Sequence, residues 1–207
     1  MSGLHLALAA LAMAEPIHAK RLPPVELCTS EPGFEEFRSR LRQIVARKDE
    51  SDLLALLSDD VEVNFGGDRG PALFAANWEF EGPGESHVWG ELEDALSRGC
   101  APTGDALMAP SLGVQFPEDL DPFDTWIARP GTVLRERPED HAPIIAKLDW
   151  DLLAASDPND DGWESVRLLD GRHGFVRHEQ LVSPLDYRLV IERRDGKWLI
   201  TAFVAGD

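Results

Sequence analysis

Cysteine and histidine are the residues of this chain best suited to nucleophilic or metal chemistry. A cysteine peptidase needs a thiolate with a downstream histidine as base. Cys100 has His141 and His173 downstream, but both lie among short predicted strands, and no α/β catalytic domain is left to hold such a site. His173 and His178 are five positions apart on either side of a predicted strand, without the frame of a zinc site. We therefore expect no catalytic residues and no enzymatic activity.

An acidic segment near the middle of the second half resembles the start of a calcium loop. Asp157, Asn159, Asp161 and Gly162 match positions 1, 3, 5 and 6 of an EF-hand loop. Position 12 is Leu168, so the bidentate carboxylate that completes the cage is absent. We expect an acidic turn, and no metal or cofactor.

Trp150 is the strongest candidate for ligand contact, because it follows a predicted strand and stands between two aspartates. Aromatic side chains with one exposed face stack on sugars and peptides. The carboxylates of Asp149, Asp151 and Asp160 would suit a cationic group such as a peptide amine. For Trp163 and Phe175, on neighbouring predicted strands, we expect core packing.

The N-terminal residues predict export. Leu4 to Ala14 is an almost continuous apolar run, too short for the roughly 20 residues that a membrane-spanning helix needs. It fits the apolar region of a signal peptide spanning 1–19, although no Lys or Arg precedes it, and a buried helix is the alternative. We expect a periplasmic or secreted protein with no membrane insertion after cleavage.

Two cysteines, Cys28 and Cys100, fit that compartment. An even number of cysteines in an oxidising environment favours pairing, and only one pairing exists here. Two buried free thiols are the alternative. We predict a Cys28–Cys100 disulfide.

The net charge of −18 argues against nucleic acid as a partner. A nucleic-acid-binding protein needs a cationic surface that displaces counterions from the phosphates. Hydrophobic residues make up 43% of the 207, which is enough to build a core.

The first half of the chain shows helical periodicity. Phe34, Phe37, Leu41 and Ile44 recur at three- and four-residue intervals and predict a helix over about 32–48, after which Asp49 is suited to cap a short second helix. A strand over 61–65 and further helices near 71–78 and 89–96 follow, and 101–124 reads as an irregular connection. We expect a helix-rich N-terminal domain over 28–122.

After Asp124 the pattern changes to short strands separated by turn signals. Asp170-Gly171 is a strong hairpin turn between the runs 163–168 and 174–176. A second hairpin, turning at Asp195-Gly196, closes the chain over 185–207. This spacing favours a small all-β barrel over 125–184.

Residues 131–182 resemble the bacterial SH3-like (SH3b) domain of cell-envelope proteins. The resemblance rests on four segments in family-like order, Gly131-Thr132-Val133-Leu134-Arg135, Pro143 to Leu148, Gly162 to Val166, and Asp170 to Val176. It implies a small SH3-like β-barrel. With the predicted helices before it and the predicted hairpin after it, we expect an α+β protein with a helical N-terminal part, the barrel and a C-terminal β-hairpin. The resemblance also implies a non-catalytic binding function, with a cell-wall peptide or an envelope protein as partner.

The flanking segments weakly resemble a nuclear-transport-factor-like cone fold. The segment from Asp49 to Val61 resembles the opening of that fold, and the last hairpin resembles its end, with the barrel inserted between them. On this alternative a small apolar molecule would occupy a pocket lined by Phe65, Phe74, Trp78 and Trp198. The sequence leaves open whether the last hairpin packs on the barrel or completes the N-terminal domain. A cell-wall hydrolase is a third alternative.

Overall fold

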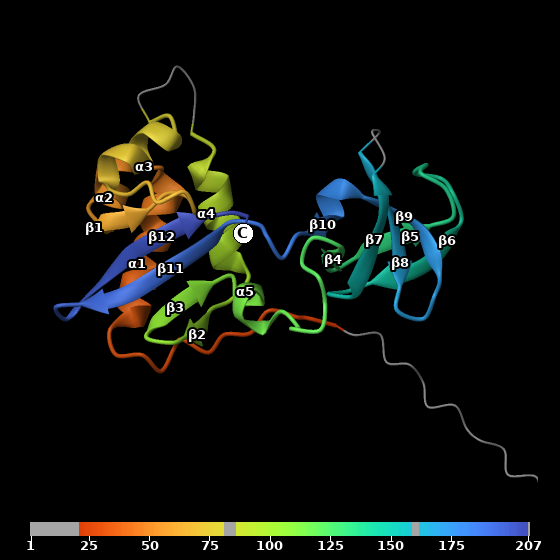
Figure 1. The fold of residues 1–207 in the computed structure, drawn as a ribbon, viewed down its shortest axis with the longest axis horizontal. Coiled ribbons are helices and arrows are strands. Elements are labelled where there is room, and N and C mark those ends of the chain that lie inside the picture. Colours follow the sequence, from red (N-terminus) through yellow and green to blue (C-terminus); the bar gives the residue numbers. More distant parts are fainter. Residues whose placement is uncertain (1–20, 81–85, 159–161, 207) are drawn as a thin grey trace, which may run out of the picture.

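The computed structural model describes residues 21–80, 86–158 and 162–206, which form two separate β-sheets with helices beside the first (Figure 1). The predicted signal peptide lies outside the described residues. The helices are α1 Phe34–Arg47, α2 Glu50–Leu54, α3 Pro71–Asn77, α4 Val88–Ser97 and α5 Leu112–Gln115, with a 3-10 turn η1 at His178–Gln180.

The strands of the first sheet come from both ends of the chain. In spatial order they are β1 Leu57–Glu62, β12 Lys197–Val204, β11 Arg188–Arg194, β3 Ala106–Ala109 and β2 Ala101–Thr103. β12 runs parallel to β1, with Leu57 opposite Ile200, and β11 pairs antiparallel with both β12 and β3. The C-terminal hairpin is therefore part of the sheet that the N-terminal half builds.

The predicted periodicity of α1 is confirmed. Phe34, Phe37, Leu41 and Ile44 are all buried on one side of the helix, where they join the core of the first sheet. The Asp49 side chain accepts a hydrogen bond from the backbone N–H of Asp52 at 3.0 Å, so it caps α2 as expected.

The predicted small SH3-like barrel is wrong. The region forms an open series of seven strands, β10 Leu181–Val182, β4 Thr125–Ala128, β7 Leu152–Pro158, β8 Trp163–Leu168, β9 His173–Arg177, β5 Thr132–Arg135 and β6 Ile144–Leu148. Within the described residues, no pairing joins β6 to β10, the two ends of this series. The Asp170-Gly171 turn does fold β8 onto β9, with Ser165 opposite Phe175. Alternation and turns specify strands and local hairpins, but not how many strands share a sheet or whether it closes.

The fold is therefore sheet-rich with few helices, and not the helical N-terminal part with a small barrel that the sequence predicted. Residues 101–124 show the difference clearly, because the expected irregular connection contains β2, β3 and α5. Proline and glycine between the short apolar runs indicated loops, so the sequence did not predict β2 and β3, which are only three and four residues long.

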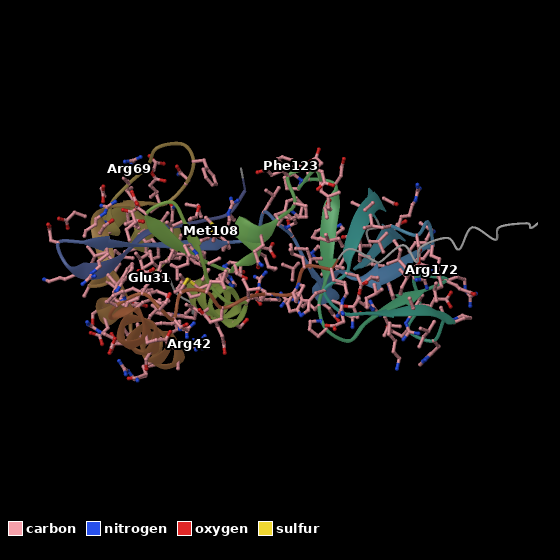
Figure 2. All side chains as sticks on the ribbon, turned by 90° about the horizontal axis from the view of Figure 1, so that it is seen from below. Glu31, Arg42, Arg69, Met108, Phe123 and Arg172 are labelled. Atoms are coloured by element: carbon pink, nitrogen blue, oxygen red, sulfur yellow. A yellow bond between two sulfur atoms is a disulfide. The ribbon has the colours of Figure 1, made fainter. Side chains whose placement is uncertain are left out.

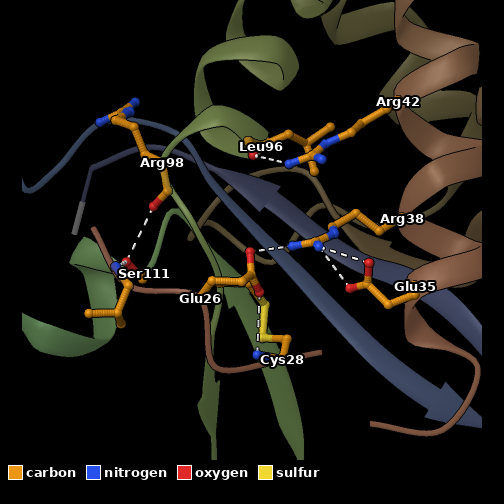
Figure 3. The surroundings of a disulfide bond; sticks show 10 residues. Glu26, Cys28, Glu35, Arg38, Arg42, Leu96, Arg98 and Ser111 are labelled. Carbon is orange, nitrogen blue, oxygen red and sulfur yellow. Dashed lines mark hydrogen bonds and ion pairs between the residues drawn. A yellow bond between two sulfur atoms is a disulfide. The ribbon is translucent and has the colours of Figure 1, made fainter. Parts of the chain in front are cut away.

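The predicted disulfide is confirmed between Cys28 and Cys100. It ties the segment before α1 to the start of β2, where the backbone N–H of Leu27 also donates to the Cys100 carbonyl. Figure 3 shows Glu26 beside this bond, paired with Arg38 of α1. Within the described ranges, every helix is too short or too polar to cross a membrane.

We expect reduction of the disulfide to destabilise the protein. The bond closes a loop with a sequence separation of 72, which in the chain-entropy model is worth about 4 kcal/mol. Urea unfolding followed by circular dichroism, with and without a phosphine reductant, measures the difference. The Cys28→Ser/Cys100→Ser double variant should be equally destabilised and insensitive to the reductant. Equal urea midpoints for oxidised and reduced wild type would contradict the prediction.

Candidate functional site

The predicted ligand residues of the second half are engaged in contacts within the chain. Trp150 is half-buried and packs against the cluster that contains Leu22 and Leu152. Asp149 forms an ion pair with Arg21, and an Asp151 carboxylate oxygen accepts a hydrogen bond from the Asp149 N–H at 2.7 Å.

These contacts anchor the segment before α1 to the second sheet, in addition to the N–H of Leu22, which donates to the Trp150 carbonyl at 2.8 Å. Asp160, the fourth predicted ligand residue, lies outside the described residues, as does most of the acidic turn. Ligand binding by Trp150 and the three aspartates stays a prediction.

Trp163 and Phe175, for which we expected core packing, lie on the neighbouring strands β8 and β9. Trp163 is only 3% exposed, whereas Phe175 is half-buried.

The side chains considered for hydrolysis do not assemble into a site. Cys100 is held in the disulfide. Ser165 Oγ lies 2.8 Å from His173 Nε2, a pair that the sequence analysis missed because the two residues meet only across β8 and β9. Within the part of the chain that the structure describes, no carboxylate contacts the other ring nitrogen of His173, so the third member of a hydrolytic triad is missing.

The four residues expected to line one apolar pocket are separated by the fold. Phe74 is fully buried, with its ring centroid 6.2 Å from that of Trp78. Phe65 is 55% exposed, and the Arg188 guanidinium lies over its ring. Trp198 contacts Phe34 instead, with ring centroids 5.5 Å apart.

The space beside Phe74 and Trp78 is filled by further aromatic rings. Trp78 stacks on Phe203 at 5.4 Å and lies 4.9 Å from Tyr187, and Phe80 stacks on Trp89 at 5.8 Å. These rings pack against the core cluster of the first sheet. We conclude that these described side chains act as core.

Trp198 borders a groove of about 490 Å³ at the opposite end of α1 from Lys48. The groove lies where the start of α1, the chain after α2 and the start of β12 meet, and its lining residues are Gly33, Glu36, Phe37, Arg40, Ala55, Leu56, Lys197, Trp198 and Leu199. Its volume falls within the roughly 300–1,000 Å³ of small-molecule sites.

The indole of Trp198 is held in one orientation. Its Nε1–H donates to the Pro32 carbonyl at 3.1 Å, and its ring meets the edge of Phe34. Phe37 and Leu56 are buried beneath the groove, and Leu199 is half-buried beside it. The apolar wall is therefore pre-formed.

Two cations and one acid stand at the rim of this groove. Arg40, Lys197 and Glu36 are all exposed. Among the described residues, neither Arg40 nor Lys197 forms an ion pair. The rim thus has an excess of positive charge in a chain whose net charge is −18.

A second groove, of about 400 Å³, lies between α1 and α4. It is lined by Val45, Ala46 and Leu96 with Arg42, Glu93 and Ser97. Arg42 donates to the Leu96 carbonyl at 3.0 Å, as Figure 3 shows, so its guanidinium is already used in joining the two helices. This groove contains no aromatic side chain, and we regard it as the weaker candidate. Figure 2 shows Arg42, which belongs to α1, well away from Arg172 in the turn between β8 and β9.

A network of charges connects the two sheets. Asp94 of α4 forms ion pairs with two arginines. One is Arg98, directly after α4, and the other is Arg129, which follows β4 and places its Nη1 2.9 Å from Asp94 Oδ1. Burial alone would raise the pKa of Asp94, but the Arg129 hydrogen bond and the Arg98 charge outweigh it, so this pKa lies below its usual 3.8. Burial raises the pKa of Asp186, whose carboxylate lies 4.0 Å from Arg98 Nη1.

Comparison with solved structures finds NTF2-like proteins. An NTF2-like protein of unknown function from Pseudomonas putida shares 13% identity at a TM-score of 0.31, covering 87% of each chain. A chain from Xanthomonas campestris described as a calcium/calmodulin-dependent protein kinase II association domain shares 14% identity at a TM-score of 0.30, covering 90% of this chain and 96% of its own. No protein-family model and no curated protein sequence matches the chain.

The Pseudomonas putida protein is named for the same family as the cone-fold resemblance of the flanking segments, but TM-scores near 0.3 assign no fold to this chain.

We expect Asp94→Asn and Asp186→Asn to change stability in opposite directions at pH 7. Loss of the Asp94 charge leaves the buried Arg98 guanidinium without its carboxylate, which should cost about 2 kcal/mol. Loss of the Asp186 charge removes a desolvated carboxylate and should raise the melting midpoint. Thermal unfolding of both variants beside wild type measures the two effects.

The same variants have a defined pH dependence. Because the folded-state pKa of Asp94 is lowered, its contribution is present above pH 3.8 and is lost as the pH falls through the folded value. The penalty from Asp186, whose pKa is raised, applies above its folded pKa and vanishes below 3.8. A destabilised Asp186→Asn variant at pH 7 would refute the assignment.

Proposed function

We propose that this protein is a non-catalytic binding protein for a small amphipathic anion, held in the groove between α1, α2 and β12. The observation that carries the proposal is the indole of Trp198, fixed by Pro32 and Phe34 and bordering a groove with an apolar floor and a cationic rim. The ligand would have an apolar body and one carboxylate or similar group.

The apolar part of the groove supports the binding of a hydrocarbon or aromatic body. The Trp198 N–H is already satisfied by the Pro32 carbonyl, so the indole has only apolar surface left to offer. Leu199, from the same strand, extends this surface beside Ala55 and Leu56. Burial of apolar ligand surface there would contribute about 25 cal/mol per Å² removed from water.

The rim favours a negative group on the ligand. Arg40 from α1 and Lys197 from β12 stand on two different elements that border the groove, so a carboxylate between them would be bound from two sides. Glu36 offsets part of this charge and would disfavour a dianion. Exposed ion pairs contribute little, about 0–1 kcal/mol each, so the charges select the ligand more than they retain it.

The lining residues support a role without catalysis. None of the nine described residues around the groove is a serine, threonine, cysteine or histidine. The pairing of a serine, threonine or cysteine nucleophile with a histidine base is therefore absent from these described lining residues.

Export is part of the proposal, since the Cys28–Cys100 disulfide suits an oxidising compartment. A ligand in the cell envelope, free or attached to a partner protein or cell-wall peptide, would meet this groove there.

We expect decanoate to bind the full chain more tightly than decanol, as measured by isothermal titration calorimetry. The Arg40→Glu/Lys197→Glu double variant should lose this preference and bind decanoate about tenfold more weakly, because two exposed cations become anions. Trp198→Ala should weaken the binding of both decanoate and decanol, since each ligand loses its contact with the indole surface.

The Arg137→Glu/Lys147→Glu double variant supplies the matched control, because it reverses an exposed arginine in the loop between β5 and β6 and an exposed lysine on β6, neither of which lines the groove. It should leave decanoate binding unchanged. Equal effects of this control and of Arg40→Glu/Lys197→Glu on decanoate binding would show that net charge alone governs binding, and would contradict the proposal.

A further inference from the structure

A small polar pocket on the second sheet contains an arginine fixed against a buried tryptophan. The pocket, of about 270 Å³, is lined by Val133, Arg135, Asp140, Trp163, Arg177, Glu179 and Gln180. The Arg177 guanidinium carbon lies 4.3 Å from the ring centroid of Trp163, which is only 3% exposed. A cation over the face of tryptophan is stabilised by the ring quadrupole, so this guanidinium is held in place before any ligand arrives.

The Arg177 guanidinium already binds one carboxylate, that of Asp140. Arg177 Nε and Nη2 donate to Oδ1 and Oδ2 of Asp140 at 3.1 and 2.6 Å, the two-point geometry by which arginine recognises a carboxylate. The Arg177 hydrogen bond lowers the pKa of Asp140, with smaller contributions from Arg135 and His141, so Asp140 is ionised at neutral pH.

A second arginine stands beside this pair. Arg135 is half-buried, and its Nη1 donates to the Ala142 carbonyl at 2.8 Å, just beyond the turn that holds Asp140. Its charge also acts on Asp140, so the carboxylate lies within the field of two guanidinium groups.

The ion pair that holds Asp140 against Arg177 is weak. Asp140 comes from the loop between β5 and β6, and its side chain is 62% exposed, whereas that of Arg177 is 33% exposed. An exposed ion pair is worth about 0–1 kcal/mol, and the two-point geometry of Arg177 places this pair towards the upper end of that range. Displacing it costs little, and Arg177 remains supported by Trp163 after Asp140 has left.

We propose that Arg177, with Trp163 beneath it, and Arg135 form a carboxylate-binding pocket in which Asp140 takes the place of an external carboxylate. The site is distinct from the Trp198 groove, which lies on the first sheet. The ligand class is a small carboxylic acid or the free C-terminal carboxylate of a peptide, which share the group that Arg177 recognises.

The test follows the Arg177 Nε–H and Trp163 indole N–H signals of the ¹⁵N-labelled full chain during titration with acetate. Asp140→Ala removes the internal competitor and should bind acetate about fivefold more tightly than wild type, the factor that corresponds to about 1 kcal/mol. Arg177→Gln should abolish the response. N-acetyl-alanyl-alanine and its C-terminal amide extend the comparison, and only the free acid should bind.

The source of the carboxylate follows from the same titrations, because a dipeptide acid that binds more tightly than acetate indicates a peptide C-terminus, and equal affinities indicate a small acid. Asp170→Ala is the matched control, since Asp170 forms a similar pair with Arg172 on an exposed turn outside any of the pockets described here. It should leave acetate affinity unchanged. Acetate binding that is no tighter in Asp140→Ala than in wild type, or equal binding of the dipeptide amide, would overturn the proposal.

Discussion

The parallel pairing of β12 with β1 is the constraint on which the first sheet depends. It joins strands from opposite ends of the chain, with Leu57 opposite Ile200, and the whole second sheet is formed by residues between them. The same pairing sets Trp198 beside Phe34 and thereby creates the groove against α1. Closing so long a loop is entropically costly, and burial of Ile200, Phe203 and their neighbours in the shared core offsets that cost.

Local features were readable from the sequence because they depend on neighbouring residues. The stripe from Phe34 to Ile44 gave α1, Asp49 gave the cap of α2, and Asp170-Gly171 gave the turn between β8 and β9. The disulfide followed from there being only two cysteines. Sheet membership did not follow, because the apolar residues of β11 and β12 could pack on any apolar face, so the pairing of these strands with β1 and β3 was left open.

The site was only partly accessible to sequence reasoning. Trp198 was among the predicted pocket residues, but its three companions lie in the aromatic core or on the surface, because ring contacts form between elements distant in sequence. Arg177 over Trp163 was missed for the same reason, although both residues fall on strands that were predicted. In both places a tryptophan lies beside arginine or lysine in a chain whose net charge is −18, and this shared feature is the basis on which we propose two local sites for anions.

Contact between a bound amphipathic anion and the Trp198 indole can be observed directly. Intermolecular nuclear Overhauser effects between the methylene protons of decanoate and the assigned indole protons of the six tryptophans would locate the ligand on the full chain. Effects to Trp198 and the side chains of Phe37 and Leu199 are the expected result. Effects confined to other tryptophans, or to Val45 and Leu96 between α1 and α4, would contradict it.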